Sequence, residues 1–113
     1  MTPSETLRKF YTTLEQNDAE ASRRLLHPDF RFRGPMLQTD GAEQFLAAIK
    51  EMAMQSRFKD IDMIERCETI VSFFTCEILA PFTGSFRMAE RAVIREGRLV
   101  SSELIYDTGP FPK

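Results

Sequence analysis

The amino-acid sequence predicts one α+β domain over residues 1–113. Three observations support this fold class. The length and the 42% share of hydrophobic residues suit a single soluble domain with a buried core. In the first half of the chain, apolar residues recur at the three- and four-residue spacing of amphipathic helices. From Phe58 onward the hydrophobic period changes to two, which is typical of β-strands.

Three amphipathic helices are expected before these strands. Ser4 is a good N-cap for the first helix, and Asn17 and Asp18 end that helix and cap a short second one. Asp40 and Glu43 form a pair that resembles a capping box at the start of the third. The apolar sides of the three helices carry Leu7, Phe10, Tyr11 and Leu14; Ala21, Leu25 and Leu26; and Phe45, Leu46, Ile49 and Met52.

The strands follow from alternation and from turn residues. Pro28 ends the second helix, because the residue before a proline avoids helical angles. Phe30 and Phe32 then alternate with arginines, as in a strand that has a short partner at residues 36–38. Further strands are expected at residues 58–65, 69–79 and on both sides of Glu96-Gly97 within residues 85–107.

The hairpin of residues 85–107 carries the clearest chemical signal. A two-residue link that ends in Gly97 indicates a tight turn, although a three-residue loop is an alternative. With regular pairing, Glu90 lies directly opposite Glu103 on a mostly apolar face. Two such acids in a pocket would split their pKa values, so that one could move protons near neutral pH. The alternatives are a β-bulge that separates the acids, or an outward face on which arginines pair with them. The same face would carry Phe86, Met88, Ala92 and Ile94 and, on the second strand, Leu99, Ser101, Ile105 and Asp107.

The strand of residues 69–79 is apolar on both faces, whereas a half-exposed antiparallel strand is normally polar on one. Helices can cover only one of these faces. A homodimer joined sheet to sheet explains the second face, and a sheet that closes on itself is the alternative.

Composition excludes several classes of function. A net charge of −2 and a pI near 5.4 argue against general nucleic-acid binding. No stretch has the length of a membrane span, and two cysteines with a single histidine do not have the spacing of a metal site. We therefore expect a cytoplasmic protein with no metal, no cofactor and no membrane or nucleic-acid partner.

The order of these elements resembles the nuclear transport factor 2-like superfamily and, within it, the SnoaL-like branch. The matching stretches are FYTTLEQNDAEASRRLLHPDFRF, TDGAEQFLAAI, VIREGRL and LIYDTGPF. The resemblance implies a cone-shaped barrel, in which a strongly curved, mostly antiparallel sheet wraps around the three helices and encloses an apolar pocket. The superfamily includes ketosteroid isomerase, limonene epoxide hydrolase and polyketide cyclases. The position of the isomerase base is Gly34 here, and that of a hydrolase aspartate is Leu104.

The candidate site follows from these patterns. We expect a small apolar molecule as the ligand and a homodimer as the assembly. The predicted chemistry is cofactor-independent isomerisation, cyclisation or hydration; a non-catalytic binding or assembly module is the alternative. Each tyrosine has a second interpretation as a core ring, and Asp107 as a residue that only fixes the exit of the chain. The predicted catalytic residues are Glu90, Glu103 and Tyr106, and the predicted ligand-binding residues are Tyr11, Phe32, Phe45, Met88 and Asp107.

Overall fold

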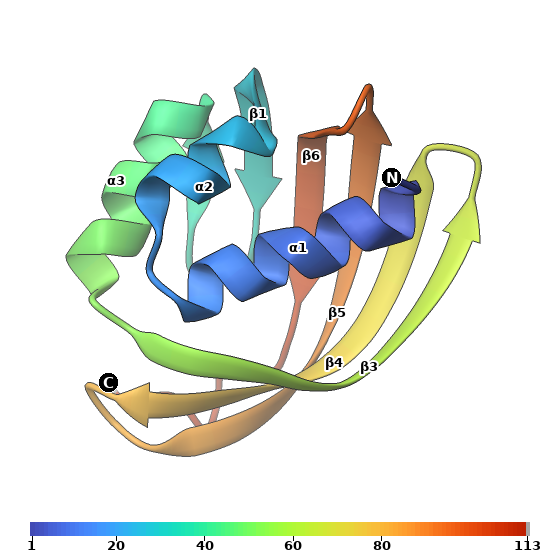
Figure 1. The fold of residues 1–113 in the computed structure, drawn as a ribbon. Coiled ribbons are helices and arrows are strands. Elements are labelled where there is room, and N and C mark those ends of the chain that lie inside the picture. Colours follow the sequence, from blue (N-terminus) through green and yellow to red (C-terminus); the bar gives the residue numbers. More distant parts are fainter. Residues whose placement is uncertain (113) are drawn as a thin grey trace.

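The computed structural model describes residues 1–112 and confirms the predicted α+β fold, with three helices and a curved six-stranded sheet (Figure 1). None of the helices in residues 1–112 is long and apolar enough to span a lipid bilayer. The elements in chain order are α1 (Pro3–Glu15), α2 (Ala19–Arg24), β1 (Leu26–Arg33), β2 (Gln38–Asp40), α3 (Ala42–Met52), β3 (Gln55–Arg66), β4 (Thr69–Ala80), β5 (Gly84–Arg95) and β6 (Arg98–Ile105).

The strands lie in the order β2-β1-β6-β5-β4-β3, and only the β1–β6 pair is parallel. Figure 1 shows the sheet bending beneath α1, with α2 and α3 beside its β1–β2 end. Since β2 and β3 are the two edges, the sheet is an open cone and not a closed barrel. Closure of the sheet on itself therefore does not explain why β4, predicted at residues 69–79, is apolar on both faces.

The helix boundaries differ from the predicted ones where capping depends on exact backbone geometry. Thr2, and not Ser4, caps α1: its hydroxyl accepts from the amide of Glu5, whose carboxylate accepts from the amide of Thr2. The α3 helix begins after Gly41, whose φ of 95° favours glycine, and no side chain caps it. Asp40 instead ends β2 and pairs with Arg33.

The second helix also ends earlier than expected. The α2 helix stops at Arg24, and β1 already begins at Leu26, so that Pro28 lies inside a strand. Pro28 therefore does not terminate the helix as predicted. A proline that lacks an N–H is tolerated there because the β1–β6 pairing is irregular between Leu26 and Arg31.

One extra residue in β6 decides which side chains face inward. Glu96 and Gly97 both have positive φ, so the two-residue turn is as predicted. Ile94 pairs with Leu99, but Val93 pairs with Ser101, which leaves Val100 as the extra residue of a β-bulge. The predicted pairing of the two acids is therefore wrong, because the register beyond the bulge is shifted by one residue. Glu90 lies opposite Leu104, and Glu103 lies opposite Arg91.

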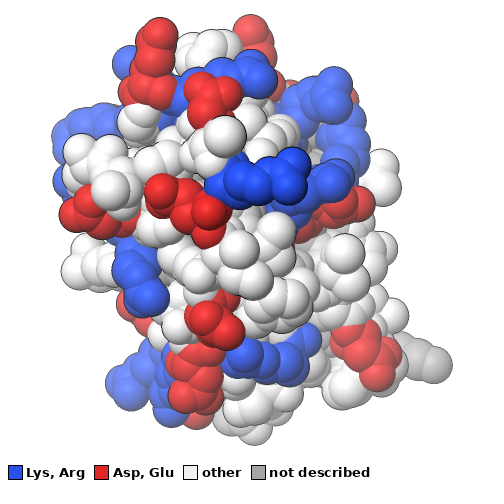
Figure 2. Space-filling model, turned by 90° about the vertical axis from the view of Figure 1, so that its right-hand side faces the viewer, with Lys and Arg blue, Asp and Glu red and all other residues white. Residues whose placement is uncertain are grey.

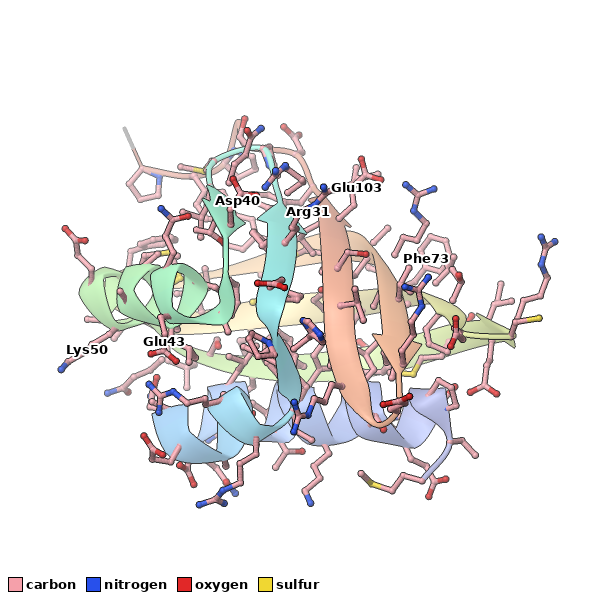
Figure 3. All side chains as sticks on the ribbon, turned by 90° about the horizontal axis from the view of Figure 1, so that it is seen from above. Arg31, Asp40, Glu43, Lys50, Phe73 and Glu103 are labelled. Atoms are coloured by element: carbon pink, nitrogen blue, oxygen red, sulfur yellow. The ribbon has the colours of Figure 1, made fainter. Side chains whose placement is uncertain are left out.

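The two faces of the sheet have different surroundings. Residues that point to the concave side pack against the helices, and Ile70, Phe74 and Ile78 of β4 are almost completely buried there. The convex side has large apolar residues that stay exposed, and Figure 3 shows Phe73 and Glu103 on this side. We call it the outer face and define it by Ile64, Phe73, Leu79 and Ile105, which are 40–62% exposed.

Charged side chains are dispersed over the surface. In Figure 2, acidic and basic residues alternate with uncharged ones on the side shown, without a large area of one sign. Arg23 pairs with Glu20 and Glu43 and so joins α2 to α3, while Arg95 at the end of β5 pairs with Glu68 in the β3–β4 turn. Such exposed pairs contribute little stability individually, so the concave core holds the fold together.

We expect Phe30→Ala to lower the free energy of unfolding by about 3–5 kcal/mol, because this ring is completely buried and its removal leaves a cavity. Phe30→Leu, which keeps most of the volume, should cost clearly less. Urea unfolding followed by circular dichroism measures both. If both variants lost the same small amount of free energy of unfolding, this would contradict the tight packing of Phe30 in the core.

Candidate functional site

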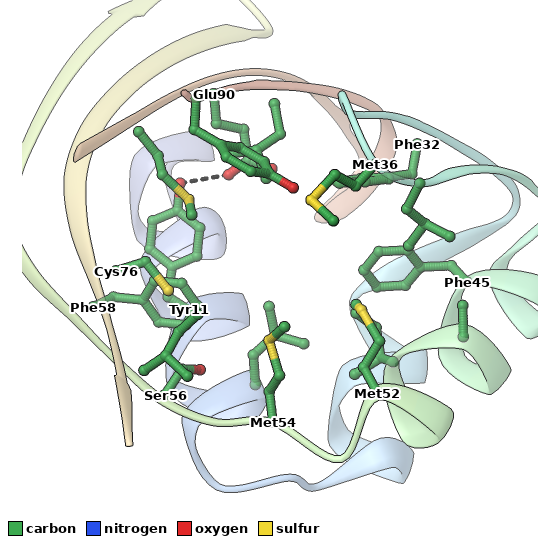
Figure 4. Close-up of a pocket in the computed structure, with 18 of the residues that line it drawn as sticks. Tyr11, Phe32, Met36, Phe45, Met52, Met54, Ser56, Phe58, Cys76 and Glu90 are labelled. Carbon is green, nitrogen blue, oxygen red and sulfur yellow. Dashed lines mark hydrogen bonds between the residues drawn. The ribbon is translucent and has the colours of Figure 1, made fainter. Parts of the chain in front are cut away.

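A cavity of about 550 Å³ lies between the concave face of the sheet and helices α1 and α3 (Figure 4). Its wall is mostly apolar and draws on α1, α3 and every strand except β2. Aromatic rings form much of it: Phe10, Tyr11, Phe30, Phe32, Phe45, Phe58, Phe74, Tyr106 and Phe111. A concave, apolar chamber with few polar groups is the usual form of a small-molecule site.

Methionine side chains form another part of the wall. Figure 4 shows Met36, Met52 and Met54 directed toward the hollow, and Met88 of β5 also lines it. Met36 and Met52 are 57% and 36% exposed, so they lie where the cavity opens to solvent. Methionine is flexible and polarizable, and these residues can therefore adapt the entrance to ligands of different shape.

Glu90 is the carboxyl group of the cavity interior, and it is only 5% exposed. The Tyr11 hydroxyl donates a hydrogen bond of 2.5 Å to one of its oxygens, and the Ser102 hydroxyl donates to the other. Burial raises the pKa of Glu90, and the two hydroxyl donors offset this only in part. The raised pKa favours the neutral carboxylic acid.

Three elements bring these groups together. Tyr11 lies on the buried side of α1, one turn after Leu7, and its ring stacks on Phe58 with centroids 4.9 Å apart. Glu90 points inward because β5 alternates and its neighbours Met88 and Ala92 in this alternation are buried. Ser102 faces inward only because of the bulge in β6.

The hydroxyl of Ser72 lies beside Glu90 as well. Ser72 of β4 pairs directly with Glu90 of β5, and the side chain of Ser72 is completely buried. Its oxygen has no hydrogen-bond partner among residues 1–112. Burial, followed by the nearby carboxyl of Glu90, raises the pKa of Tyr11, so its hydroxyl remains a hydrogen-bond donor at neutral pH.

The structure places five of the predicted site residues besides Glu90 in the cavity wall: Tyr11, Phe32, Phe45, Met88 and Tyr106. Their roles toward a ligand stay predictions.

Glu103 and Asp107 do not face the cavity, and the prediction that they do is wrong. Glu103 lies on the convex side and pairs with Arg91 at 3.0 Å, because the bulge turns it outward. Asp107 is exposed and accepts a hydrogen bond of 2.9 Å from the amide of Gly109, so it shapes the exit of the chain.

The C-terminal segment closes one part of the wall. Phe111 is 9% exposed, and its ring lies 4.1 Å from that of Phe86 and 5.2 Å from that of Tyr106, measured between centroids. Burial raises the pKa of Tyr106, so it too stays a neutral donor near pH 7.

Ser102 and Ser72, which also lie at Glu90, were not predicted from the sequence. No sequence signal reveals Ser102, since regular alternation from the turn places Ser101 inward. For Ser72, a polar residue among the inward apolar residues of β4 was a usable signal. Within residues 1–112, no three His, Cys, Asp or Glu side chains come together as a metal site would require.

Comparison with known proteins agrees with this geometry. A search of characterised proteins finds no significant sequence relative. Solved structures are similar throughout: an NTF2-like protein of unknown function from Cytophaga hutchinsonii has a TM-score of 0.85 at 17% identity, covering 97% of this chain and 94% of that one. A candidate polyketide cyclase from Pseudomonas putida has a TM-score of 0.83 at 20% identity, covering 95% and 92%.

TerC, crystallised with polyporic acid, has a TM-score of 0.82 at 22% identity, covering 97% of this chain and 95% of that one. At such identities these likenesses establish the fold alone. The SnoaL-like domain family, however, matches the sequence itself over residues 7–102, which is most of the chain. The chain therefore belongs to the SnoaL-like domain family.

Proposed function

We propose that this protein binds a small apolar or aromatic molecule in the cavity, with Glu90 and Tyr11 as its polar anchor. The observation that carries the proposal is a buried carboxyl, held by two hydroxyl groups, in a chamber whose wall is otherwise mostly apolar. A carboxyl is costly to bury. Its position in the chamber wall gives it a use in recognising or transforming a ligand.

The aromatic walls favour a flat ligand. Phe45 and Phe32, with ring centroids 5.2 Å apart, form one side of the hollow, and the stacked pair of Tyr11 and Phe58 forms the other (Figure 4). A ligand between them buries apolar surface at about 25 cal/mol per Å². A carbonyl or hydroxyl at its inner end would meet Glu90.

The proposed chemistry is cofactor-independent proton transfer. The neutral carboxylic acid of Glu90 can give its proton to a ligand oxygen, and the resulting carboxylate can take a proton from a neighbouring carbon. Tyr106, which also lines the cavity, would orient the ligand by donating a hydrogen bond. Isomerisation, cyclisation and hydration all require such a group.

The raised pKa of Glu90 makes its own contribution to how the free energy of unfolding depends on pH. The folded-state pKa is raised above the unfolded value of about 4.3. The folded protein therefore binds the proton more tightly than the unfolded chain, and this contribution is lost as the pH rises from the unfolded pKa to the folded one. We expect wild type to lose stability relative to Glu90→Gln over this window, by at most about 1.4 kcal/mol per pH unit.

Urea unfolding of both proteins at a series of pH values from about 4 upward tests this expectation. Glutamine closely matches the neutral acid in shape, so the difference in free energy of unfolding between the two proteins at the lowest pH serves as the reference. A difference that is constant with pH would contradict a raised pKa.

Binding can be tested with a library of small aromatic and alicyclic compounds by thermal shift, since a ligand of the native state raises its apparent stability. Compounds that stabilise wild type should lose at least about tenfold in affinity with Phe45→Ala, which removes one wall. Ile64→Ala, on the outer face, is the matched control and should bind as wild type does. Shifts of the same size in all three proteins would place binding outside the cavity.

Compounds that bind also separate catalysis from binding. If the protein is an enzyme, Glu90→Gln removes turnover and leaves a large part of the affinity, because glutamine keeps the shape but cannot transfer a proton. Binding without conversion by wild type identifies the alternative, a ligand-binding module.

A second candidate function is assembly into a homodimer through the outer face. This face exposes Phe73 at 40% and Ile105 at 62%, and the two lie in one row because both pair with Ala89. Large apolar side chains grouped on a sheet are typical of interaction surfaces. A second copy of the chain would cover them sheet to sheet.

We expect wild type to sediment as a dimer at micromolar concentration and Phe73→Asp as a folded monomer, because the substitution places a charge at the centre of this face. Arg24→Gln changes an exposed residue of α2 and makes the net charge more negative by the same amount as Phe73→Asp does. This control variant should remain dimeric. A monomeric wild type contradicts the assembly function.

A further inference from the structure

The titratable groups of the cavity share one chemical character. Among the described residues that line it, every titratable side chain is an acid: Tyr11, Glu51, Cys76, Glu90 and Tyr106. Glu51 is exposed near the end of α3, and the other four lie deeper, on α1, β4, β5 and the segment after β6.

The cavity disfavours negative charge on these groups. Burial is the largest cause of a raised pKa for Tyr11, Glu90 and Tyr106, and it raises the pKa of Cys76 to about 11. Four acids on four segments respond in the same direction. The effect is therefore a property of the chamber and not of one contact.

Charged groups outside the chamber contribute less than burial to the pKa values of these acids. Arg8, exposed on α1, lowers the pKa of Tyr11 as the smallest of the contributions to it. Glu15, at the end of α1, adds to the raised pKa of Cys76. Neither of these charges is part of the cavity wall.

Among the described residues, no Lys, Arg or His lines the cavity, and two hydroxyl donors beside Glu90 are already engaged. Tyr11 and Ser102 both donate to the carboxyl of Glu90, one to each of its oxygens. A ligand carboxylate or phenolate would enter an apolar chamber without a cationic partner, where unpaired charge is most costly.

We propose that the cavity binds its ligand in an uncharged form, and that a weakly acidic ligand, such as a phenol or an enol, takes up one proton from solvent as it binds at a pH above its own pKa. This rests on the proposed function, since it concerns the ligand of the same cavity. It restricts the substrate class to neutral molecules that present an oxygen atom, such as a hydroxyl, carbonyl or ether oxygen, to Glu90.

Three matched probes test the proposal on the full chain: para-nitroanisole, which cannot ionise; para-nitrophenol, whose anion has a distinct absorption band; and para-nitrobenzoate, a permanent anion near neutral pH. Dissociation constants are measured by equilibrium dialysis at several pH values. Ala48→Trp serves as the control for binding elsewhere, because Ala48 lines the cavity and a tryptophan there would fill it.

We expect the dissociation constant of para-nitroanisole to be independent of pH, and that of para-nitrophenol to rise about tenfold per pH unit above the pKa of the free phenol. The bound phenol should keep the absorption of its neutral form. Para-nitrobenzoate should bind at least about 100-fold more weakly than para-nitroanisole.

A bound phenolate spectrum, or equal affinity for the benzoate and the anisole, would overturn the uncharged-ligand proposal and leave the proposed binding function standing. If para-nitroanisole binds wild type no better than Ala48→Trp, the proposed binding function itself fails, and this inference fails with it.

Discussion

The hydrogen-bonded pair of Tyr11 and Glu90 is the constraint on which the site depends. It joins α1 to the middle of the sheet across 79 residues of sequence, and both partners are buried. A neutral carboxylic acid with two hydroxyl partners can remain in such a chamber, whereas an unpaired carboxylate there would destabilise the fold. The same desolvation that raises the pKa of Glu90 also favours its proton-donating form, so the stability of the cone and its proposed chemistry have one physical cause.

The bulge at Val100 determines which groups meet this acid. It turns Ser102 inward to donate to Glu90 and turns Glu103 outward to pair with Arg91. Without the extra residue, two carboxyls would face each other, and their repulsion would have to be relieved by a proton or a cation. Within residues 1–112, Glu90 is thus the single buried carboxyl side chain. Since this fold hosts many functions, the position of that acid carries more information than the family does.

The sequence was sufficient to predict the fold because its signals are local and agree: helical spacing before residue 56, alternation afterwards, and Gly97 in a tight turn. It was also sufficient to predict that Glu90 points inward, since apolar neighbours alternate with it along one strand. Ser102 and Glu103 could not be predicted correctly, because a bulge depends on the curvature of the whole sheet and leaves no mark in the residues around Val100. The contact between Tyr11 and Glu90 likewise follows from how the helix crosses the sheet.

The most direct test of the central claim is a carbon-13 NMR titration of the Glu90 carboxyl, assigned by comparison with Glu90→Gln. We expect this carboxyl to titrate clearly above the ordinary glutamate pKa of about 4.3, and the resonance of its partner, the Tyr11 hydroxyl, to shift with it. A Glu90 carboxyl that titrates at the ordinary value, independently of Tyr11, would contradict the buried neutral acid and the site built around it.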